Sequence, residues 1–439
     1  MYSPLEIEKF LIKETDSWDF IKEVDKKDLI EQIHELGGNS FKTVPFVHQL
    51  ASFLLGIHKK SFLYYLFCGA GKSKISLDLL NYWFTNKKVS RALILVPYTL
   101  TIESWEEQIK EHSNFKYLPL LGTTKQRWEL LKNVNNYDLV GLSYPGLTAM
   151  IPRLVVKTKN RKKIVLDYTE LDKFSGYFDS IIYDEIHLVK GYNSIIFSIC
   201  KYLSNKYKYK YGLTGTPTSR NLEDLWTQFY LIDGGETLGK NISFYRQAFF
   251  EEKKNYWGGY DYKVSKDKKA LLLKVIKNIS ISYKDTEVFD LPEKINIKRY
   301  LLPTKQQTEF YKKAMDGIIE AKGDITLLEN SFVKLRQITS GFIKFISNEG
   351  DEVKIIFDEN PKLQALLELL EETGEEKVVV FNEYTITGDI ICDKLKQEKI
   401  GYARLYGDTG DKYETMQRFL IEKDCRVYVV NSKSGAMSL

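Results

Sequence analysis

A glycine-rich stretch, Gly69 to Ser73 (GAGKS), places the strongest constraint on how this 439-residue chain can fold. It follows an apolar run of strand length at residues 63–67 and precedes apolar residues at three- and four-residue spacing, which predict a helix. Glycines between a strand and a helix let backbone N–H groups converge on a phosphate. In such a loop Lys72 would reach the β- and γ-phosphates, and the Ser73 hydroxyl would ligate Mg²⁺. The strict pattern has glycine in place of Leu66, so an ordinary turn is the alternative.

Further apolar runs of strand length occur at residues 92–96, 139–142, 180–183 and 211–214, with helix-like stretches between them. Apolar strands that alternate with helices are typical of a parallel sheet covered on both faces. Ligands of such sheets bind at the carboxyl ends of the strands. We therefore predict an α/β fold in which the glycine loop and the polar residues after the later strands lie along one sheet edge.

Polar residues follow two of these strands. Asp184 and Glu185 come directly after the run at 180–183. Beside a phosphate loop, the aspartate would hold Mg²⁺ and the glutamate would orient or deprotonate an attacking water. Seen alone, the pair is equally well a solvated acidic turn. The last run ends in residues that could carry hydrogen bonds from the phosphate site to a second partner, although alone they form a mere turn: Thr214, Gly215 and Thr216.

Taken together, these segments resemble the Swi/Snf (sucrose-non-fermenting) branch of the helicase-like DNA translocases of superfamily two. In the first half of the chain the resemblance rests on residues 45–49 (PFVHQ), 67–73 (FCGAGKS), 93–97 (LILVP), 142–144 (LSY), 184–187 (DEIH) and 213–226 (from LTGTP to NLEDLW). The last segment is the most specific, because strand-separating helicases commonly carry Ser-Ala-Thr there. In the second half it rests on residues 291–294 (LPEK), 302–311, 335–337 (LRQ), 378–384 (VVVFNEY), 404–407 (RLYG) and 429–436 (VVNSKSGA).

The resemblance implies two RecA-like parallel-sheet lobes, the second incomplete, with helical protrusions between them. It implies ATP and Mg²⁺ as cofactors, and the catalytic residues Lys72, Asp184 and Glu185. Gln49 is expected to contact the adenine. The full set of residues expected at the nucleotide is Gln49, Gly69, Ala70, Gly71, Lys72, Ser73 and Lys74. The metal would be held by Ser73 and Asp184, and the coupling residues would be Thr214, Gly215 and Thr216. The residues expected to contact DNA are Pro97, Ser143, Tyr144, Asn382, Lys433, Ser434 and Gly435.

The function that this resemblance implies is ATP-driven translocation on double-stranded DNA, held mainly through its phosphates and so without sequence preference. The alternatives are a strand-separating or restriction-type helicase of the same superfamily, and an ATP-gated DNA-binding module that does not hydrolyse ATP. The chain ends at Leu439, within the motif that the segment at 429–436 resembles. It thus ends before the family's next motif, whose arginines reach the γ-phosphate. We therefore expect ATP binding but weak hydrolysis from this chain as written, unless a further segment or a partner protein supplies those arginines.

Patterning divides the chain into successive segments. We expect a helical N-terminal segment at 1–42, an ATP-binding lobe at 43–232, a helical protrusion at 233–290, a helical lead into the second lobe at 291–345 and a partial second lobe at 346–439. The aromatic residues of the protrusion either stack on bases or pack in the interior, and packing is favoured. The basic stretch Lys157 to Lys163 either contacts phosphates or forms a solvated loop.

Composition excludes several other classes of protein. The net charge of +5 is mild and does not by itself indicate nucleic-acid binding. The four cysteines and five histidines are scattered, without a Cys-x-x-Cys pair, which argues against a structural zinc site and suits a reducing compartment. Neither a signal peptide nor an apolar run of about 18 residues occurs. We therefore expect no membrane partner and a cytoplasmic location, in a bacterium or a phage-infected host.

Overall fold

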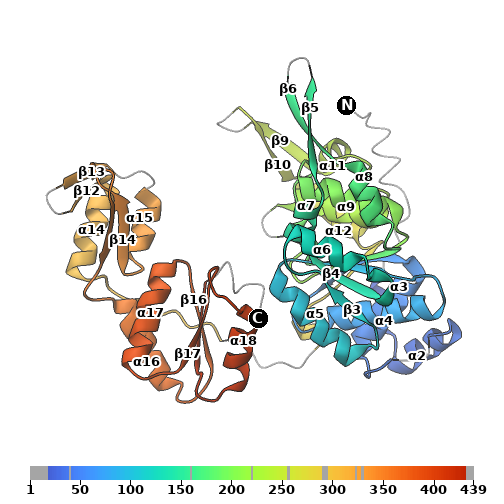
Figure 1. The fold of residues 1–439 in the computed structure, drawn as a ribbon, viewed down its shortest axis with the longest axis horizontal. Coiled ribbons are helices and arrows are strands. Elements are labelled where there is room, and N and C mark those ends of the chain that lie inside the picture. Colours follow the sequence, from blue (N-terminus) through green and yellow to red (C-terminus); the bar gives the residue numbers. More distant parts are fainter. Residues whose placement is uncertain are drawn as a thin grey trace. The chain divides into compact units, whose positions relative to one another are not determined.

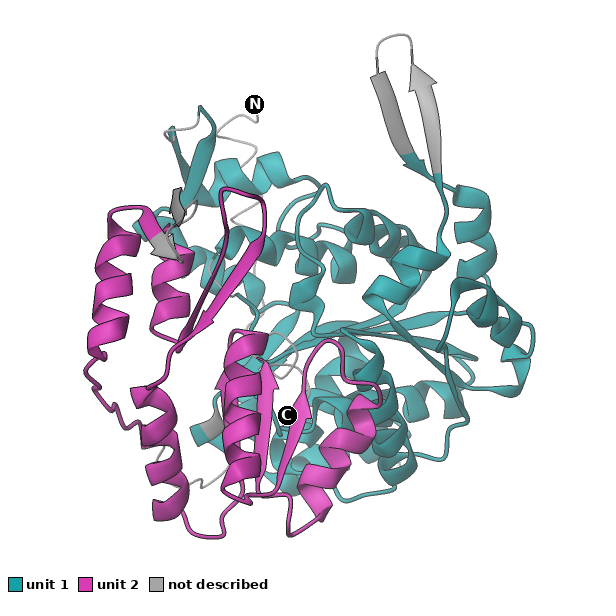
Figure 2. Ribbon diagram, turned by 60° about the vertical axis from the view of Figure 1, so that its left-hand side comes forward, with its two compact units in different colours: residues 1–292 teal, residues 293–439 magenta. Residues whose placement is uncertain are grey.

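The computed structural model describes residues 18–38, 41–158, 161–218, 221–254, 258–288, 295–321, 324–327 and 331–431. The chain divides into two compact units, residues 1–292 and residues 293–439 (Figure 2). Each unit contains its own parallel sheet, so the predicted α/β fold with parallel sheets is confirmed. No helix in the described part of the chain combines the length and the apolar character needed to cross a membrane.

The first unit contains a seven-stranded sheet in which all neighbouring strands are parallel (Figure 1). In sheet order the strands are β11 (Ser280–Tyr283), β1 (Ser61–Leu66), β8 (Tyr209–Thr214), β7 (Ser180–Asp184), β2 (Ala92–Val96), β4 (Leu139–Ser143) and β3 (Tyr117–Pro119). The apolar runs predict β1, β2, β4, β7 and β8, but neither β3 nor β11. The central strands are buried along their length, as expected for a parallel sheet covered on both faces.

Helices connect these strands and direct their apolar residues inward. The α-helices are α2 (Lys26–Glu35), α3 (Val47–Lys59), α4 (Lys72–Thr85), α5 (Thr99–His112), α6 (Thr124–Leu131), α7 (Tyr144–Met150), α8 (Tyr168–Ser175), α9 (Ile195–Lys206) and α10 (Leu225–Asp233). Short 3₁₀ helices are η1 (Asp19–Glu23), η2 (Val134–Asn136), η3 (Ile186–Leu188) and η4 (Leu222–Asp224). In α4, Ile75, Leu79 and Leu80 are fully buried, so the predicted spacing does form a buried helical face.

The segment after α10 is mixed, and not the helical protrusion that the sequence predicts. It contains α11 (Ile242–Phe249), β9 (Phe250–Lys254), β10 (Tyr260–Val264), α12 (Lys266–Ile276), β11 and α13 (Asp285–Val288). Strands β9 and β10 form an antiparallel hairpin, and most of β9 is exposed, so no alternating apolar pattern marks it in the sequence. The packing interpretation is confirmed for the buried rings of Phe244, Tyr245, Phe249 and Phe250. The other two aromatic candidates, Tyr256 and Trp257, lie outside the described residues.

The basic stretch between β4 and β7 forms a second antiparallel hairpin. Its strands are β5 (Arg153–Thr158) and β6 (Arg161–Leu166), and their register pairs Lys157 with Lys162. The described part of this stretch is therefore a hairpin, and both the predicted phosphate contact and its solvated alternative stay predictions.

The second unit contains a three-stranded parallel sheet in the order β16 (Val378–Asn382), β18 (Val427–Asn431) and β17 (Tyr402–Leu405). Helices α16 (Pro361–Glu372), α17 (Thr385–Gln397) and α18 (Lys412–Ile421) surround it. Alternate residues of β18 belong to two different clusters: Val427 and Val429 pack with α16 and α17, whereas Tyr428 and Val430 pack with α18. Both faces of this sheet are therefore covered.

A smaller region precedes that sheet. It contains α14 (Lys305–Met315), β12 (Ile318–Ala321), β13 (Asp324–Leu327), α15 (Ser331–Ile338), β14 (Phe342–Ile346) and β15 (Glu352–Ile356). The four strands pair as two antiparallel hairpins. The predicted helical lead at 291–345 therefore contains strands as well as helices.

Candidate active site

Three loops meet at the carboxyl edge of the main sheet in the first unit. They follow β1, β8 and β7, which are consecutive neighbours and run parallel. Because parallel neighbours end at the same edge, the loops that carry Lys72, Thr214 and Glu185 lie side by side. The structure thus brings the glycine loop, the Thr-Gly-Thr segment and the acidic pair together from three separate parts of the sequence.

The glycine loop has a backbone conformation that glycine adopts readily and other residues do not. Gly69 has φ +83° and Gly71 has φ +78°. Gly71 is also the N-cap residue of α4. A Cβ atom at this position would lie 2.1 Å from Nε2 of Gln49. The loop therefore requires glycine at position 71 both for its conformation and for the close approach of α3.

Two side chains of α3 tether that helix to the loop. Gln49 donates from Nε2 to the Ala70 carbonyl oxygen at 3.2 Å, and its Oε1 accepts from the Phe46 N–H at 3.0 Å. His48 Nε2 lies 2.8 Å from the same Ala70 oxygen, and it carries the hydrogen because a carbonyl only accepts. Burial lowers the pKa of His48 by more than this hydrogen bond raises it, so the ring is neutral at pH 7. Because both amide atoms of Gln49 are engaged within the protein, its contact with adenine stays a prediction.

Consecutive residues at the start of α4 take different directions. Lys72 Nζ donates to the carbonyl oxygens of Leu66 and Phe67 at 3.1 and 3.3 Å, so its ammonium group lies inside the loop. The Ser73 side chain is half-buried in the first turn. Lys74, in contrast, forms an almost fully buried ion pair with Asp78 at 2.8 Å. The ammonium group of Lys74 is therefore engaged with Asp78, and the nucleotide contact predicted for this residue stays a prediction.

Asp184, the last residue of β7, is held by two aromatic donors. The indole N–H of Trp105 in α5 donates to Oδ2 at 2.9 Å. The hydroxyl of Tyr144 in α7 donates to the Asp184 carbonyl oxygen at 2.7 Å. Burial and the neighbouring charge of Glu185 raise the pKa of Asp184 to about 6, against the Trp105 hydrogen bond and the charge of Lys72. The carboxylate is therefore mostly ionised at neutral pH and available to a cation.

Glu185 has a strained backbone and a low-pKa side chain. Its φ of +48° is in the left-handed region, which is uncommon for a residue with a Cβ atom and typical of functional sites. Its Oε2 accepts from the Thr214 hydroxyl at 2.7 Å and lies 3.0 Å from His187 Nδ1. Burial alone would raise the pKa of Glu185, but these two contacts and the charge of Lys72 together lower it. A weakly basic carboxylate is better suited to orient a water molecule than to take its proton.

The third loop, which follows β8 and carries Thr214, is hydrogen-bonded to the acidic loop and packs against the glycine loop. The buried Thr214 hydroxyl lies 2.8 Å from His187 Nδ1 and accepts from the Thr216 N–H at 3.1 Å. A Cβ atom at Gly215 would lie 3.2 Å from the Leu66 carbonyl oxygen, so this loop packs directly against the backbone that leads into the glycine loop. These contacts connect the residues predicted to couple the site to a partner, and the coupling itself stays a prediction.

The oxygen donors of the site fit Mg²⁺. This ion is usually held by one or two protein oxygen ligands, with phosphates and water completing the shell. The Asp184 carboxylate and the Ser73 hydroxyl supply donors of that kind at one sheet edge. Across the described residues, no group of three or more His, Cys, Asp or Glu side chains is arranged to hold a metal. The donors therefore suit a cation that arrives with a nucleotide.

Trp105 and His187 are site residues that the sequence analysis does not assign. Trp105 shares the buried face of α5 with Ile102 and Ile109, so its spacing is that of an ordinary core residue. No local signal indicates its contact with a carboxylate 79 positions away. His187 lies within the acidic motif, two residues after Glu185. That proximity is the sequence signal that could have indicated its contact with Glu185.

The residues predicted to contact DNA are buried wherever they are described: Pro97, Ser143, Tyr144 and Asn382. Ser143 caps α7 by accepting from the Gly146 N–H at 3.1 Å. Asn382 in the second unit donates to the Val430 carbonyl oxygen at 3.2 Å. These side chains are thus engaged within the protein, and their predicted DNA contacts stay predictions. Three further predicted contacts lie outside the described residues: Lys433, Ser434 and Gly435.

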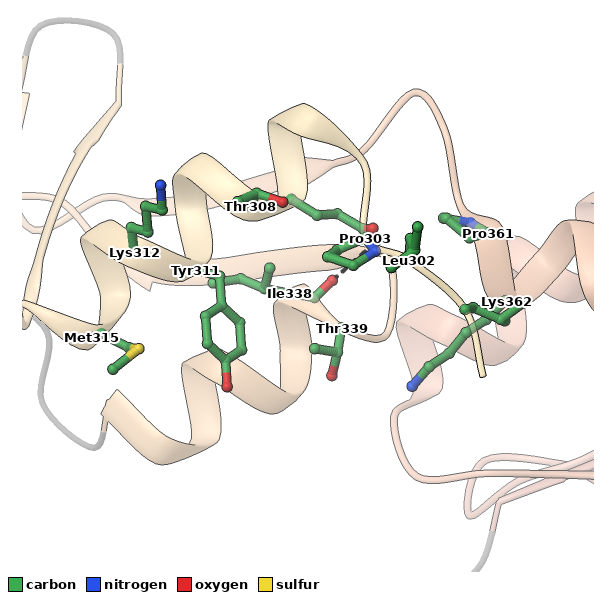
Figure 3. Close-up of a pocket in the computed structure, with 12 residues that line it drawn as sticks. Leu302, Pro303, Thr308, Tyr311, Lys312, Met315, Ile338, Thr339, Pro361 and Lys362 are labelled. Carbon is green, nitrogen blue, oxygen red and sulfur yellow. Dashed lines mark hydrogen bonds between the residues drawn. The ribbon is translucent and has the colours of Figure 1, made fainter. Parts of the chain in front are cut away.

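An apolar cavity of about 500 Å³ in the second unit is a poorer candidate for an active site (Figure 3). Tyr311 and Met315 of α14, Ile338 of α15 and Pro361 of α16 line it. Its lining includes two lysines but neither a carboxylate nor a histidine, so it lacks an acid–base pair. The sheet edge of the first unit remains the candidate active site.

Comparisons with known proteins show what this chain is similar to. A family described as the SNF2-related domain matches residues 51–351, more than half of the chain. An uncharacterized ATP-dependent helicase of Mycoplasma genitalium is 24% identical over 383 residues, covering 84% of this chain and 33% of that protein. Putative protein p41 of Acyrthosiphon pisum secondary endosymbiont phage 1 is 24% identical over 352 residues, which cover 78% of this chain and 72% of that protein. The ISWI chromatin-remodeling complex ATPase ISW2 of Saccharomyces cerevisiae is 21% identical over 399 residues, which cover 84% of this chain and 32% of that protein.

The chain spans about a third of the length of the mycoplasma and yeast relatives. Among solved structures, it is similar to the SWI2/SNF2 ATPase core of Sulfolobus solfataricus in complex with double-stranded DNA. That similarity has 19% identity and a TM-score of 0.43, and it covers 89% of this chain and 78% of the other.

Proposed function

Because this chain belongs to the SNF2-related family, as its motifs predict, we propose that it is an ATP-dependent translocase on double-stranded DNA. The carrying observation is the sheet edge where the charge of Lys72 acts on both Asp184 and Glu185. A cation for phosphates, one carboxylate for Mg²⁺ and another for water are the parts that phosphoanhydride hydrolysis needs. The names of two relatives support a nucleic-acid substrate: one is called an ATP-dependent helicase and the other a chromatin-remodeling complex ATPase.

At the nucleotide, the glycine loop binds the phosphates through its backbone N–H groups. The Lys72 ammonium group exchanges the carbonyl oxygens of Leu66 and Phe67 for the β- and γ-phosphate oxygens, and Gln49 contacts the adenine. Ser73 and Asp184 would hold Mg²⁺, which would supply positive charge to neutralise the phosphates. Glu185 orients the attacking water.

Hydrolysis is linked to movement through the third loop. Loss of the γ-phosphate frees Lys72 to return to the backbone at Leu66, and Gly215 packs against that same carbonyl group. Thr214 connects this shift to Glu185. DNA is held mainly by its phosphates, so binding weakens steeply with salt and varies little with sequence.

The test is ATP hydrolysis by the purified chain with and without double-stranded DNA, alongside displacement of a triplex-forming strand. We expect ATP binding, hydrolysis that is weak in this chain as written but is stimulated by DNA, and triplex displacement without separation of the duplex. Lys72→Ala should abolish hydrolysis, and Glu185→Gln should abolish it while ATP still binds. Lys132→Ala is the matched control, because this lysine side chain is 68% exposed and lies outside the site.

The other outcomes distinguish the alternatives. Separation of the duplex strands would identify a helicase, and nucleotide-dependent DNA affinity without turnover would identify an ATP-gated binding module. A wild-type chain that binds no ATP would contradict the proposal altogether. So would a DNA affinity that depends strongly on base sequence.

A further inference from the structure

Trp105 is buried next to the acidic pair but belongs to a distant part of the sequence. Helix α5 follows β2, which pairs with β7 in the sheet, so the helix passes beside the end of β7. The Trp105 side chain is only 2% exposed, and its indole N–H donates to Asp184 Oδ2 at 2.9 Å. This N–H is the only hydrogen-bond donor of a tryptophan side chain. Its direction is therefore fixed on the carboxylate.

We propose that Trp105 is a positioning residue that orients the Asp184 carboxylate for the metal–nucleotide complex. The inference rests on the proposed function, and it adds a residue that does not itself touch the nucleotide. Partners that bond to a metal ligand set its orientation, and their removal typically weakens metal binding about 10–100-fold.

The surroundings of Asp184 favour this role over simple packing. Tyr144, itself 6% exposed, donates to the backbone carbonyl of Asp184, so side chain and main chain are each held by an aromatic donor from a different helix. The carboxylate also takes a hydrogen bond from the Glu185 backbone. With one oxygen bonded to the indole, rotation of the carboxylate is restricted. A purely packing role would need the ring of Trp105 but not its N–H group.

The experiment removes the N–H group and keeps the ring. Trp105 is replaced by phenylalanine and, separately, by benzothienylalanine, in which sulfur takes the place of the indole N–H. Trp83→Phe is the control, because Trp83 is also buried (5% exposed) and donates its N–H to the Tyr211 hydroxyl at 2.6 Å, away from the site. Mn²⁺ serves as the probe for the metal, and its binding to the protein–ATP complex is followed by electron paramagnetic resonance. Binding of a fluorescent ATP analogue in EDTA measures affinity without metal.

For both Trp105 variants we expect the Mn²⁺ dissociation constant to rise about 10–100-fold, while nucleotide affinity in EDTA changes less than about twofold. Trp83→Phe should leave both quantities unchanged. A folded benzothienylalanine variant with wild-type Mn²⁺ affinity would overturn the inference and leave the proposed function standing. Equal losses of affinity with and without metal would also overturn it, because they would indicate a general distortion. A wild-type chain that binds no ATP would reject the proposed function and this inference together.

Discussion

The hydroxyl of Thr214 donates a 2.7 Å hydrogen bond to Oε2 of Glu185. The two residues lie at the ends of β8 and β7, which are neighbours in the sheet. His187 lies within 3.0 Å of both of the oxygens that this bond joins. The acidic pair and the third loop therefore form one hydrogen-bonded unit, and a change in either one alters the other.

Replacing Thr214 by valine tests this unit, because valine keeps the shape and removes the hydroxyl. A hydrogen bond to a charged group contributes about 1.5–3 kcal/mol, so we expect kcat for DNA-stimulated ATP hydrolysis to fall about 10–100-fold. The KM for ATP should change little, since Thr214 bonds to Glu185 and His187 whereas Lys72 bonds to the carbonyl oxygens of Leu66 and Phe67. Steady-state kinetics measure both, and Thr214→Ser, which restores the hydroxyl, should recover most of the rate. Wild-type turnover in the valine variant would contradict the coupling role.

Replacing Gly71 by alanine tests the geometry of the phosphate loop. The residue would have to keep φ +78°, and its Cβ atom would lie 2.1 Å from Gln49 Nε2. We expect a loss of about 1–3 kcal/mol in the free energy of unfolding from backbone strain alone, and a marked loss of ATP affinity. Urea unfolding and ATP titration measure these quantities.

Gly69→Ala is the matched comparison for that variant. Gly69 has a similar φ of +83°, but a Cβ atom there would meet nothing within 4 Å. The Gly69→Ala substitution should therefore lower stability through backbone strain alone, without a steric clash. Gly71→Ala should be the more damaging of the two, and equal effects would show that the approach of Gln49 is unimportant.

Replacing Asp78 by leucine tests the buried ion pair that occupies Lys74, because leucine, unlike a protonated aspartate, offers the ammonium group no acceptor oxygen. The two side chains are 5% and 4% exposed, so removing the carboxylate leaves an ammonium group buried without its counter-ion. We expect a loss of about 3–5 kcal/mol in the free energy of unfolding, measured in urea. The double variant Lys74→Met/Asp78→Leu should recover most of it, because an apolar pair of similar volume needs no counter-ion. The exposed pair Lys110–Glu106 has the same four-residue spacing, and Glu106→Gln should cost less than about 0.5 kcal/mol.

The same pair predicts a pH dependence of stability. Burial raises the pKa of Asp78 to about 6, despite the opposing hydrogen bond and charge of Lys74. Because the folded-state pKa lies above the unfolded value, folding binds a proton, and stability from this group rises as the pH falls through 6. Between pH 8 and pH 5 the wild-type chain should gain about 1.4 kcal/mol relative to Lys74→Met/Asp78→Leu. Urea unfolding at the two pH values measures this difference, and a constant or reversed difference would contradict the assignment.

Local patterns were enough to predict much of the fold and the meeting of three loops that form the candidate site. The apolar runs identify β1, its parallel neighbour β8 and the next strand in the sheet, β7. The rule that ligands bind at strand ends then puts Lys72, Thr214 and Glu185 together. These predictions succeed because each depends on a short stretch of sequence. Strand β9 is not predicted in this way because most of its residues are exposed. Strand β11 is not predicted because its pairing with β1 joins segments that are far apart in the sequence.

The sequence by itself determined which chemical groups reach the sheet edge: the glycine loop, its lysine and the acidic pair. Only the tertiary structure decided which side chains hold those groups in place, and which nearby polar side chains are engaged or buried elsewhere. Trp105 reaches Asp184, Gln49 reaches Ala70, and Lys74 turns to Asp78, while Ser143 and Asn382 are buried. Residue spacing reports the period of one helix or strand. Contacts between elements depend instead on how those elements pack, because the burial of apolar surface decides which side chains meet.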